Sequence, residues 1–464
     1  MRTSANISSR VTARITAGCT ALAVGLSAIP AAAAPTTVEN IIIMIGDGMG
    51  YNTLDLANLY QRGTTGYQVG LQGQQVHNHK QPGFQSYPHV GMSTYAMLGA
   101  YNGLIAWTST AAATGIPTDS AAAGTAMASG HKTFHGVIGM TPTGKPLPNL
   151  TERAKAHGKA AGVVTSVPYS HATPAAYVAH EKSRNRYHNI SRQMVDSGLD
   201  VVIGAGHPWY DDDHKRLYKP DFKYISEKDW TRLSRNHTGY TFIEKAADFT
   251  ALARGTKRVN RLWGVPQVGS TLQEKRSSAL QDAAHEKVGQ TPFNKVPTLT
   301  DLSLSALNVL RHNPRGYFLM IEGGAIDWAG HDNLTARSIE ETVDFMNAVE
   351  AVGKWVEKYS SWEKTLLIVT ADHETGFING PSERAMVPLT QDVHGAIQMR
   401  WLSDEHTNQL VPFFVKGAGA SQVLRLATMH DPHRGAYLDN TDFARLVMNS
   451  WWIKSNSTER NAAA

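Results

Sequence analysis

The chain has 464 residues, of which 42% are hydrophobic and 18% are charged, so a largely disordered protein is excluded. Its single Cys excludes an intrachain disulfide framework and a zinc cluster built on cysteines. The 44 basic and 39 acidic side chains give a formal net charge of +5, which by itself favours a nucleic acid or a membrane surface as partner.

The first 34 residues carry part of this positive charge. Arg2, Arg10 and Arg14 precede an apolar run at 15–29, and small residues follow at 31–34, an order typical of a secretory signal peptide. Its removal would lower the 44 basic side chains to 41 against 39 acidic ones, and Cys19 would leave with it. We therefore expect a nearly neutral protein, exported to the periplasm or secreted, with no membrane anchor and no nucleic acid as a specific partner.

The remaining chain, 35–464, alternates short apolar runs with helical patterns. Runs typical of buried strands lie at 41–45, 162–167, 201–203, 317–321, 366–369 and 411–415. A helix of small residues is predicted at 118–129, and amphipathic helices at 302–310 and 338–359. This alternation predicts a single α/β domain, a three-layer sandwich with a large, mainly parallel central sheet flanked by helices. The stretches at about 51–105 and 207–297 have weaker periodicity, and we expect surface insertions there.

Side chains that can bind metals follow four of these predicted strands. In chain order they are Asp47, His171, Thr173, Glu322, Asp327, His331, Asp372 and His373. Ligand sites of open α/β sheets lie at the carboxyl ends of the strands, and the neighbouring glycines allow close approach of the backbone. A helix cap or a core hydrogen bond would explain any one of these residues. Several at one sheet edge predict a shared site for more than one metal ion.

The residue types indicate which metals these are. Imidazole nitrogen together with carboxylate oxygen suits zinc, whereas oxygen atoms of Asp, Glu and Thr suit magnesium. Asp327 and His331 are four residues apart, which places them on one face of a helical turn. Asp372 and His373 are adjacent and need an irregular turn to reach one ion. Two zinc ions close together would stabilise the attacking and leaving oxygens of a phosphoryl displacement.

Ser120 is the candidate nucleophile. It lies in the first turn of the predicted helix of small residues, which Thr118 or Asp119 would cap. The positive end of the helix dipole lowers the cost of an alkoxide there. The Ala and Gly residues at 121–124 leave room for a substrate and a metal ion.

From about residue 40 to 407, the chain resembles the alkaline phosphatase family. The similarity rests on segments in the family's order: IGDGMG at 45–50, TDSAA at 118–122, HATPA at 171–175, EGG at 322–324, Asp327 to His331, TADH at 370–373 and EHT at 405–407. The resemblance implies two zinc sites, whose ligands are Asp327, His331 and His406 in one and Asp47, Asp372 and His373 in the other. It also implies a magnesium ion held by Asp47, Thr173 and Glu322, at a third site that zinc could occupy instead.

The resemblance further assigns the groups that meet the substrate. Ser120 would be the phosphorylated nucleophile and a metal ligand, and Arg184 would grip two phosphate oxygens, with Asp119 in the same binding site. Some members have an acid in place of His171 and a Lys in place of Trp328. Here His171 would tune the third metal site or bind a metal-bound water, and Trp328 would lower phosphate affinity and speed product release.

The implied activity is metal-dependent hydrolysis of phosphate monoesters at alkaline pH through a phosphoserine. Two alternatives stay open: a phosphodiesterase of the same superfamily, and a secreted metal-binding protein without turnover. A sulfatase is disfavoured because residues 120–124 lack its x-Pro-x-Arg motif. Family members are commonly homodimers. The acidic run Asp211–Asp213 could bind calcium, but a solvated loop is the favoured interpretation.

Overall fold

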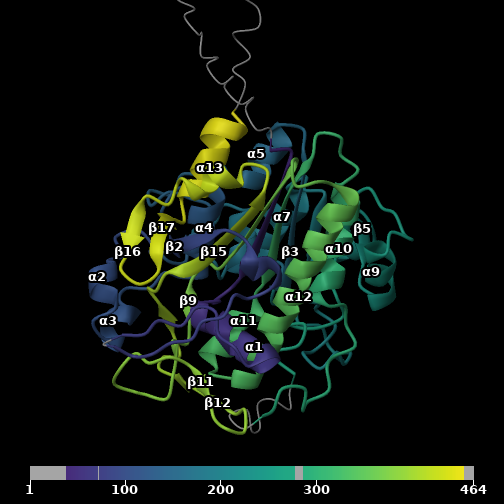
Figure 1. Ribbon diagram of the computed structural model, residues 1–464. Helices are drawn as coiled ribbons and strands as arrows, with labels where there is room; N and C mark the ends of the chain where they lie inside the picture. Colours follow the sequence, from purple (N-terminus) through teal and green to yellow (C-terminus); the bar gives the residue numbers. More distant parts are fainter. Residues whose placement is uncertain (1–37, 72, 277–285, 454–464) are drawn as a thin grey trace, which may run out of the picture. The chain divides into compact units, whose positions relative to one another are not determined.

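An 11-stranded sheet forms the centre of the fold (Figure 1). The computed structural model describes residues 38–71, 73–276 and 286–453. In spatial order the strands are β16 (Met429–Asp431), β17 (Gly435–Asp439), β2 (His89–Ser93), β15 (Val411–Gly417), β8 (Thr365–Thr370), β1 (Asn40–Gly46), β7 (Tyr317–Gly323), β3 (Ala160–Pro168), β4 (Val201–Ala205), β6 (Leu262–Gly264) and β5 (Thr241–Ile243). From β8 to β5 every pairing is parallel, whereas β15 runs antiparallel to β8 and β2.

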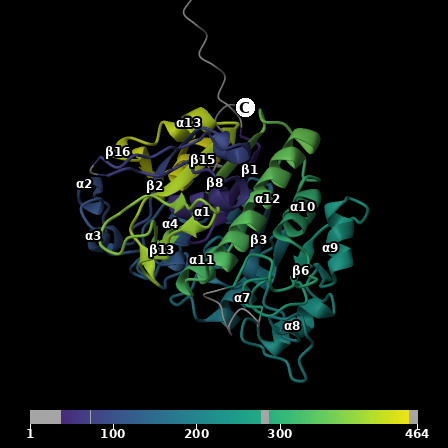
Figure 2. The ribbon, with the colours of Figure 1, turned by 60° about the horizontal axis from the view of Figure 1, so that its bottom comes forward.

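The central strands are buried on both faces, which explains their continuous apolar sequences. Every residue of β1, β7, β3 and β8 is buried. Helices α10 (Leu299–Leu310) and α12 (Thr335–Tyr359) contact β7 on one face, in front of the sheet in Figure 2. Helices α4 (Ser120–Ser129), α5 (Leu150–Ala156) and α6 (Ala172–Ala176) cover the other face. The predicted three-layer α/β fold is confirmed.

The other elements surround this sandwich. The helices are α1 (Tyr51–Arg62), α2 (Gly103–Ala106), α3 (Thr110–Thr114), α7 (Tyr187–Asp196), α8 (Glu227–Ser234), α9 (Ala246–Ala253), α11 (Ala325–His331), α13 (Ala420–Leu424) and α14 (Asp442–Leu446), with short turns at Gly83–Ser86 and Val447–Trp451. Three small antiparallel pairs join β9 (Glu374–Thr375) to β14 (His406–Thr407), β10 (Ile378–Asn379) to β13 (Arg400–Trp401), and β11 (Thr390–Gln391) to β12 (Ile397–Gln398).

All six predicted strands and the three predicted helices are present, with shifted ends. The stretches expected to be surface insertions also contribute to the sheet, since β2 lies within 51–105 and β5 and β6 lie within 207–297. These strands are only three to five residues long, too short for a sequence period to emerge.

The predicted signal peptide, 1–34, lies outside the described residues. Within the part of the chain that the structure describes, no helix is both long enough and apolar enough to cross a membrane.

Candidate metal centre

Three carboxylates meet at the carboxyl ends of adjacent parallel strands. Ile45 of β1 is paired with Glu322 of β7 on one side and with Thr370 of β8 on the other. Asp47 follows β1 directly, and Asp372 comes two residues after the end of β8. Because the strands are in register, Asp47, Glu322 and Asp372 come together, and all three are 0% exposed.

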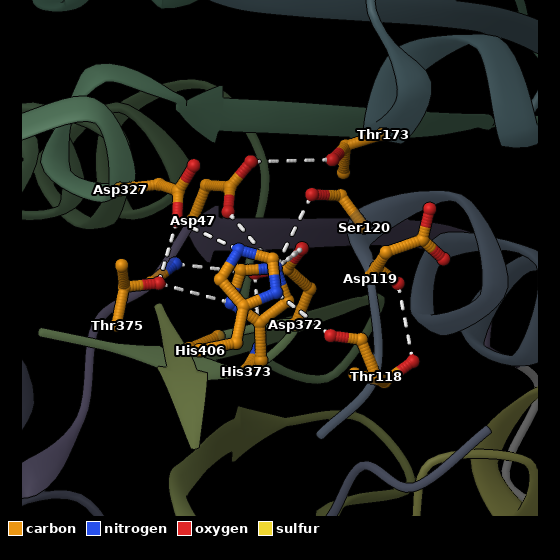
Figure 3. Close-up of polar contacts among 12 residues, drawn as sticks. Asp47, Thr118, Asp119, Ser120, Thr173, Asp327, Asp372, His373, Thr375 and His406 are labelled. Carbon is orange, nitrogen blue, oxygen red and sulfur yellow. Dashed lines mark hydrogen bonds and ion pairs between the residues drawn. The ribbon is translucent and has the colours of Figure 1, made fainter. Parts of the chain in front are cut away.

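His373 completes a first group of possible ligands with Asp47 and Asp372 (Figure 3). Its Nε2 lies 3.1 Å from Asp372 Oδ2 and 3.5 Å from Asp47 Oδ1. Neither of these two oxygens accepts a hydrogen bond from the described residues. The other Asp372 oxygen, Oδ1, accepts from the backbone N–H of Gly48 at 3.2 Å and of His373 at 3.0 Å, which fixes the carboxylate.

The hydrogen bonds of His373 indicate which of its nitrogens is free. Thr375 Oγ1 donates to Asp327 Oδ1 at 2.5 Å, so it can only accept from His373 Nδ1, 3.2 Å away. The ring proton then sits on Nδ1, and Nε2 presents a lone pair toward the two carboxylates. Three acceptor atoms therefore face one another, an arrangement that a bound cation stabilises.

Asp327, His331 and His406 form the second group. Helix α11 places Asp327 and His331 one turn apart, and the pairing of β14 with β9 brings in His406. The two Nε2 atoms are 3.0 Å apart, and Asp327 Oδ1 lies 3.4 Å from that of His331 and 3.3 Å from that of His406.

Both imidazoles of this second group are oriented by backbone carbonyls. His331 Nδ1 lies 2.6 Å from the carbonyl of Asp404, and His406 Nδ1 lies 2.7 Å from the carbonyl of Thr118. Each Nδ1 must donate to its carbonyl, so both Nε2 lone pairs point at one another and at a carboxylate oxygen. Nitrogen and oxygen donors converging without a proton donor fit a zinc ion.

The electrostatics of the centre also favour bound cations. Burial, and then three neighbouring carboxylates, raise the pKa of Asp47 well above its usual range. Burial raises the pKa of Glu322 to about 7. Carboxylates packed this closely resist ionisation together, and cations between them remove that cost.

A third group, built from oxygen atoms, lies beside the first. Thr173, at the start of α6, donates from Oγ1 to Asp47 Oδ2 at 3.5 Å. Thr165 of β3 donates to Glu322 Oε2, while Glu322 Oε1 has no partner in the described ranges. Oxygen atoms from Asp, Glu and Thr suit magnesium. His171 lies next to this group, fully neutral because burial and the Arg184 charge lower its pKa to about 3.

Ser120 is the first residue of α4, and its side chain is 2% exposed. Asp119 caps the helix, since its Oδ1 accepts from the backbone N–H of Ala122 at 3.0 Å. Ser120 Oγ lies 3.2 Å from His373 Nε2, so the hydroxyl faces the metal-ligand groups (Figure 3). The small residues of α4 let this helix pack closely on α6, since a Cβ on Gly124 would come 3.0 Å from that of Ala176.

Arg184 is held beside Ser120 by Asp119. Its Nη1 donates to Asp119 Oδ2 at 3.1 Å, and its Nη2 lies 3.5 Å from His171 Nε2. The same Asp119 oxygen accepts from the backbone N–H of Gly136, and Arg184 N donates to the Gly136 carbonyl. The cap of α4 thus also fixes the direction of the guanidinium.

A cavity of about 440 Å³ opens onto these groups. Its walls carry Ser120, His171, Arg184, Lys275, Asp327, Trp328, His331, Asp332, Glu405 and His406. The rings of His171 and Trp328 meet edge to face with centroids 5.6 Å apart. The structure therefore brings the predicted site residues to this cavity or to the adjoining ligand groups, except for Asp119, which lies behind Arg184 and accepts a hydrogen bond from it.

Sequence reasoning missed the residues that orient this site. Thr165 and Thr375 hold Glu322, Asp327 and His373 through hydroxyl hydrogen bonds, and Lys275 reaches the cavity from a distant segment. The role of Thr165 follows from its pairing with Glu322 across β3 and β7, but this strand register is visible only in the fold.

The acidic run Asp211–Asp213 closes a loop. Asp211 Oδ1 accepts from the backbone N–H of Lys215 at 2.8 Å. Asp212 Oδ1 accepts from the hydroxyl of Ser270 at 2.8 Å. These contacts account for both carboxylates as turn-stabilising groups.

Comparisons with known proteins identify relatives of this chain. Alkaline phosphatase 4 of Bacillus subtilis is 32% identical over 345 residues, covering 73% of this chain and 62% of that protein. The Escherichia coli alkaline phosphatase is 28% identical over 432 residues, covering 85% of this chain and 84% of that protein. The chain thus spans 62% of the length of both Bacillus subtilis relatives that it matches.

Solved structures show the same fold. The cold-active alkaline phosphatase of Shewanella sp. is 24% identical, with a TM-score of 0.62 over 89% of this chain and 99% of that one. The alkaline phosphatase of the Antarctic bacterium TAB5 is 22% identical, with a TM-score of 0.62 over 90% and 99%. The family model described as alkaline phosphatase matches residues 38–423. The chain therefore belongs to the alkaline phosphatase family.

Proposed function

We propose that this chain hydrolyses phosphate monoesters at alkaline pH, with Ser120 as the nucleophile, and releases inorganic phosphate. The observation that carries this proposal is the position of Ser120 Oγ, 3.2 Å from the unprotonated Nε2 of His373, in a residue that lines the same cavity as Arg184. A buried hydroxyl at a helix N-terminus, beside two convergent ligand groups, is suited to attack phosphorus.

The ligand groups would hold three cations. We assign one zinc ion to Asp327, His331 and His406, a second to Asp47, Asp372 and His373, and a magnesium ion to Asp47, Thr173 and Glu322, with zinc as the alternative at this third site. Ser120 and His171 lie at the edge of these sites. When bound, the cations act as Lewis acids that offset the negative charge of the oxygens around phosphorus.

Arg184 would orient the phosphoryl group. A guanidinium offers two parallel N–H donors that match two phosphate oxygens, and Asp119 fixes its direction from the far side. The phosphate then lies with phosphorus in line with Ser120 Oγ, which the dipole of α4 favours in its deprotonated form.

The reaction takes place in two displacements. In the first, Ser120 Oγ gives up its proton and bonds to phosphorus, the bond to the ester oxygen breaks, and this oxygen takes up a proton as the alcohol leaves. In the second, water from the cavity attacks phosphorus and gives up a proton, the bond to Ser120 Oγ breaks, the serine oxygen is reprotonated, and inorganic phosphate is released. The net reaction consumes one water molecule per ester.

Turnover of p-nitrophenyl phosphate tests this proposal against its rivals. We expect alkaline activity that a chelator abolishes and zinc with magnesium restores, and much slower turnover of bis-p-nitrophenyl phosphate. Preference for the diester would favour a phosphodiesterase, and bound metal without turnover would favour a metal-binding protein.

The nucleophile has a matched control on its own helix. Ser120→Ala should lose at least about a thousandfold in kcat with its zinc content unchanged. Ser129→Ala removes a buried hydroxyl from the last turn of α4 and should stay close to the wild type. Near-wild-type turnover by Ser120→Ala would contradict the assignment.

We further propose a role for Trp328 in product release. Its indole offers no ammonium to phosphate, so inorganic phosphate should inhibit the wild type less than it inhibits Trp328→Lys. Equal inhibition of the two proteins would contradict this role.

We also propose that residues 1–34 act as an export signal, that 35–464 form the catalytic domain, and that this domain is a periplasmic or secreted homodimer. N-terminal sequencing of the exported protein and its mass in solution test these points.

A further inference from the structure

Lys275 lies in the wall of the cavity that contains Ser120, although it comes from the segment after β6 rather than from a strand end of the central sheet. Its Nζ is 5.8 Å from the centre of the Trp328 ring, and Trp328 in turn contacts His171. An ammonium, an indole and an imidazole therefore follow one another along this wall, and the imidazole lies beside Arg184.

Two acidic side chains hold Lys275 in this position. Asp332 Oδ2 lies 2.5 Å from its Nζ on the solvent side, and Glu274 Oε1 lies 3.4 Å away on the buried side. Asp332 is itself part of the cavity wall, with a side chain 41% exposed, whereas that of Glu274 is 1% exposed. The ion pair with Asp332 is therefore the one that an incoming anion can replace.

The Lys275 ammonium is charged under alkaline conditions. Burial lowers its pKa, but Glu274 and Asp332 outweigh that effect, and the pKa is raised above its ordinary value. The group therefore stays protonated to a higher pH than an isolated lysine.

The backbone beneath Lys275 is firmly anchored. Lys275 N donates to Thr271 Oγ1 at 2.8 Å, and Thr271 is fully buried. The next residue, Arg276, is 1% exposed and donates to Glu340 at 2.9 Å. A lysine on a fixed backbone, with its tip in a catalytic cavity, is placed to recognise a ligand rather than only to solvate the surface.

We propose that Lys275 and Trp328 form a subsite for the leaving group of the substrate, and that Lys275 selects phosphate monoesters whose leaving group carries a second negative charge. This inference rests on the proposed hydrolysis at Ser120. The second negative charge of the leaving group would replace Asp332 as the ion-pair partner of the Lys275 ammonium. The apolar part of the leaving group would contact the indole of Trp328. The subsite thus sets a preference among monoesters, while the phosphoryl group itself is bound by Arg184.

A pair of matched esters measures this preference. In p-carboxyphenyl phosphate the leaving group carries a carboxylate, and in p-carbamoylphenyl phosphate a neutral amide of nearly the same shape replaces it. The readout is the ratio of kcat/KM for the charged ester to that for the neutral one. The two leaving groups differ in intrinsic reactivity, but this difference is the same for every variant. It therefore drops out when the ratio is compared between variants.

Substitutions at Lys275 should change this ratio in a defined way. In Lys275→Gln it should fall about fivefold, the scale of a partly exposed ion pair, and in Lys275→Arg it should stay within about twofold of the wild type. Lys287→Gln makes the same charge change at an exposed lysine outside the cavity wall and should leave the ratio unchanged. The wild-type preference should also shrink as ionic strength rises.

Asp332→Asn provides a test that leaves Lys275 in place. Loss of the competing carboxylate should raise the ratio, a change opposite to that of Lys275→Gln, which a general disturbance of the loop would not produce. An unchanged ratio in Lys275→Gln, or a lower ratio in Asp332→Asn, would overturn the inference. If the wild type hydrolyses neither ester, the proposed function itself fails, so the two failures are distinguishable.

Discussion

Removal of the bound cations should leave a fold whose free energy of unfolding falls as the pH rises from 6.5 to about 9. The group responsible is His406, whose Nε2 faces Asp327 Oδ1 at 3.3 Å. Without a metal ion, a proton takes the cation's place on this nitrogen. Burial lowers the pKa of His406, but Asp327 more than compensates and raises it to about 9.

The sign and size of the effect follow from this shift. A histidine whose pKa is higher in the fold than in the unfolded chain stabilises the fold fully below 6.5, and this contribution is lost as the pH passes about 9. The difference between 6.5 and about 9 corresponds to on the order of 3 kcal/mol. The His406 side chain is only 12% exposed, so solvent screens the interaction little.

Other titrating groups do not reverse this trend. The pKa of His171 is lowered from 6.5 to about 3 in the fold, so this group opposes the trend, but only slightly, because the unfolded-state histidine has already lost half of its proton at the start of the window. Glu322, with a pKa raised to about 7, destabilises the metal-free fold as it ionises and therefore acts in the same direction as His406.

Urea unfolding, followed by tryptophan fluorescence between pH 6.5 and 9, measures the effect. Chelated wild type should lose stability across this range, whereas metal-loaded protein should not, because its imidazole lone pair is already occupied. Chelated His406→Gln should lose most of the slope. Equal stability of the chelated wild type at pH 6.5 and 9, or an unchanged slope in His406→Gln, would show that His406 does not cause the pH dependence.

Three further substitutions test single parts of the site. Arg184→Lys replaces a two-pronged donor with a point charge and should raise KM for a monoester about tenfold in initial-rate kinetics; an unchanged KM would argue against the phosphate grip. Thr375→Val keeps the shape but loses the hydroxyl that orders His373, so zinc affinity should fall about tenfold in competition with a chromogenic chelator. Gly124→Val should push α4 away from Ala176 and lower the free energy of unfolding by about 1–3 kcal/mol in urea titration, and an unchanged midpoint would show that the contact yields.

The sequence predicts the centre of the fold well because its central strands are long and buried on both faces. The runs at 41–45 and 317–321 became β1 and β7, whose residues are all buried. The short strands toward the edges of the sheet were not predicted. The strand β2 contains a glycine and only two large apolar residues, and β5 and β6 have three residues each, so their pairing depends on neighbours far away in the chain.

In the site, too, the features set by local sequence were predictable and those set by distant contacts were not. Ligands directly after strand ends were predictable, because parallel strands must bring their carboxyl ends to one edge. The groups that orient them were not. The carbonyl of Thr118 holds His406, and Thr375 links His373 to Asp327, through contacts that no local spacing encodes. Lys275 belongs to a common residue type in a stretch without periodicity, and only the folded chain shows that it reaches the cavity.

Ser120 should carry the phosphoryl group between the two displacements of the proposed reaction. Metal-loaded protein mixed with a radiolabelled phosphate monoester, quenched in acid and digested, can be analysed by peptide mass spectrometry. We expect one phosphoryl group on the peptide that contains Ser120, and none in Ser120→Ala. Active protein that yields no labelled peptide, or a phosphoryl group on another residue, would contradict this expectation.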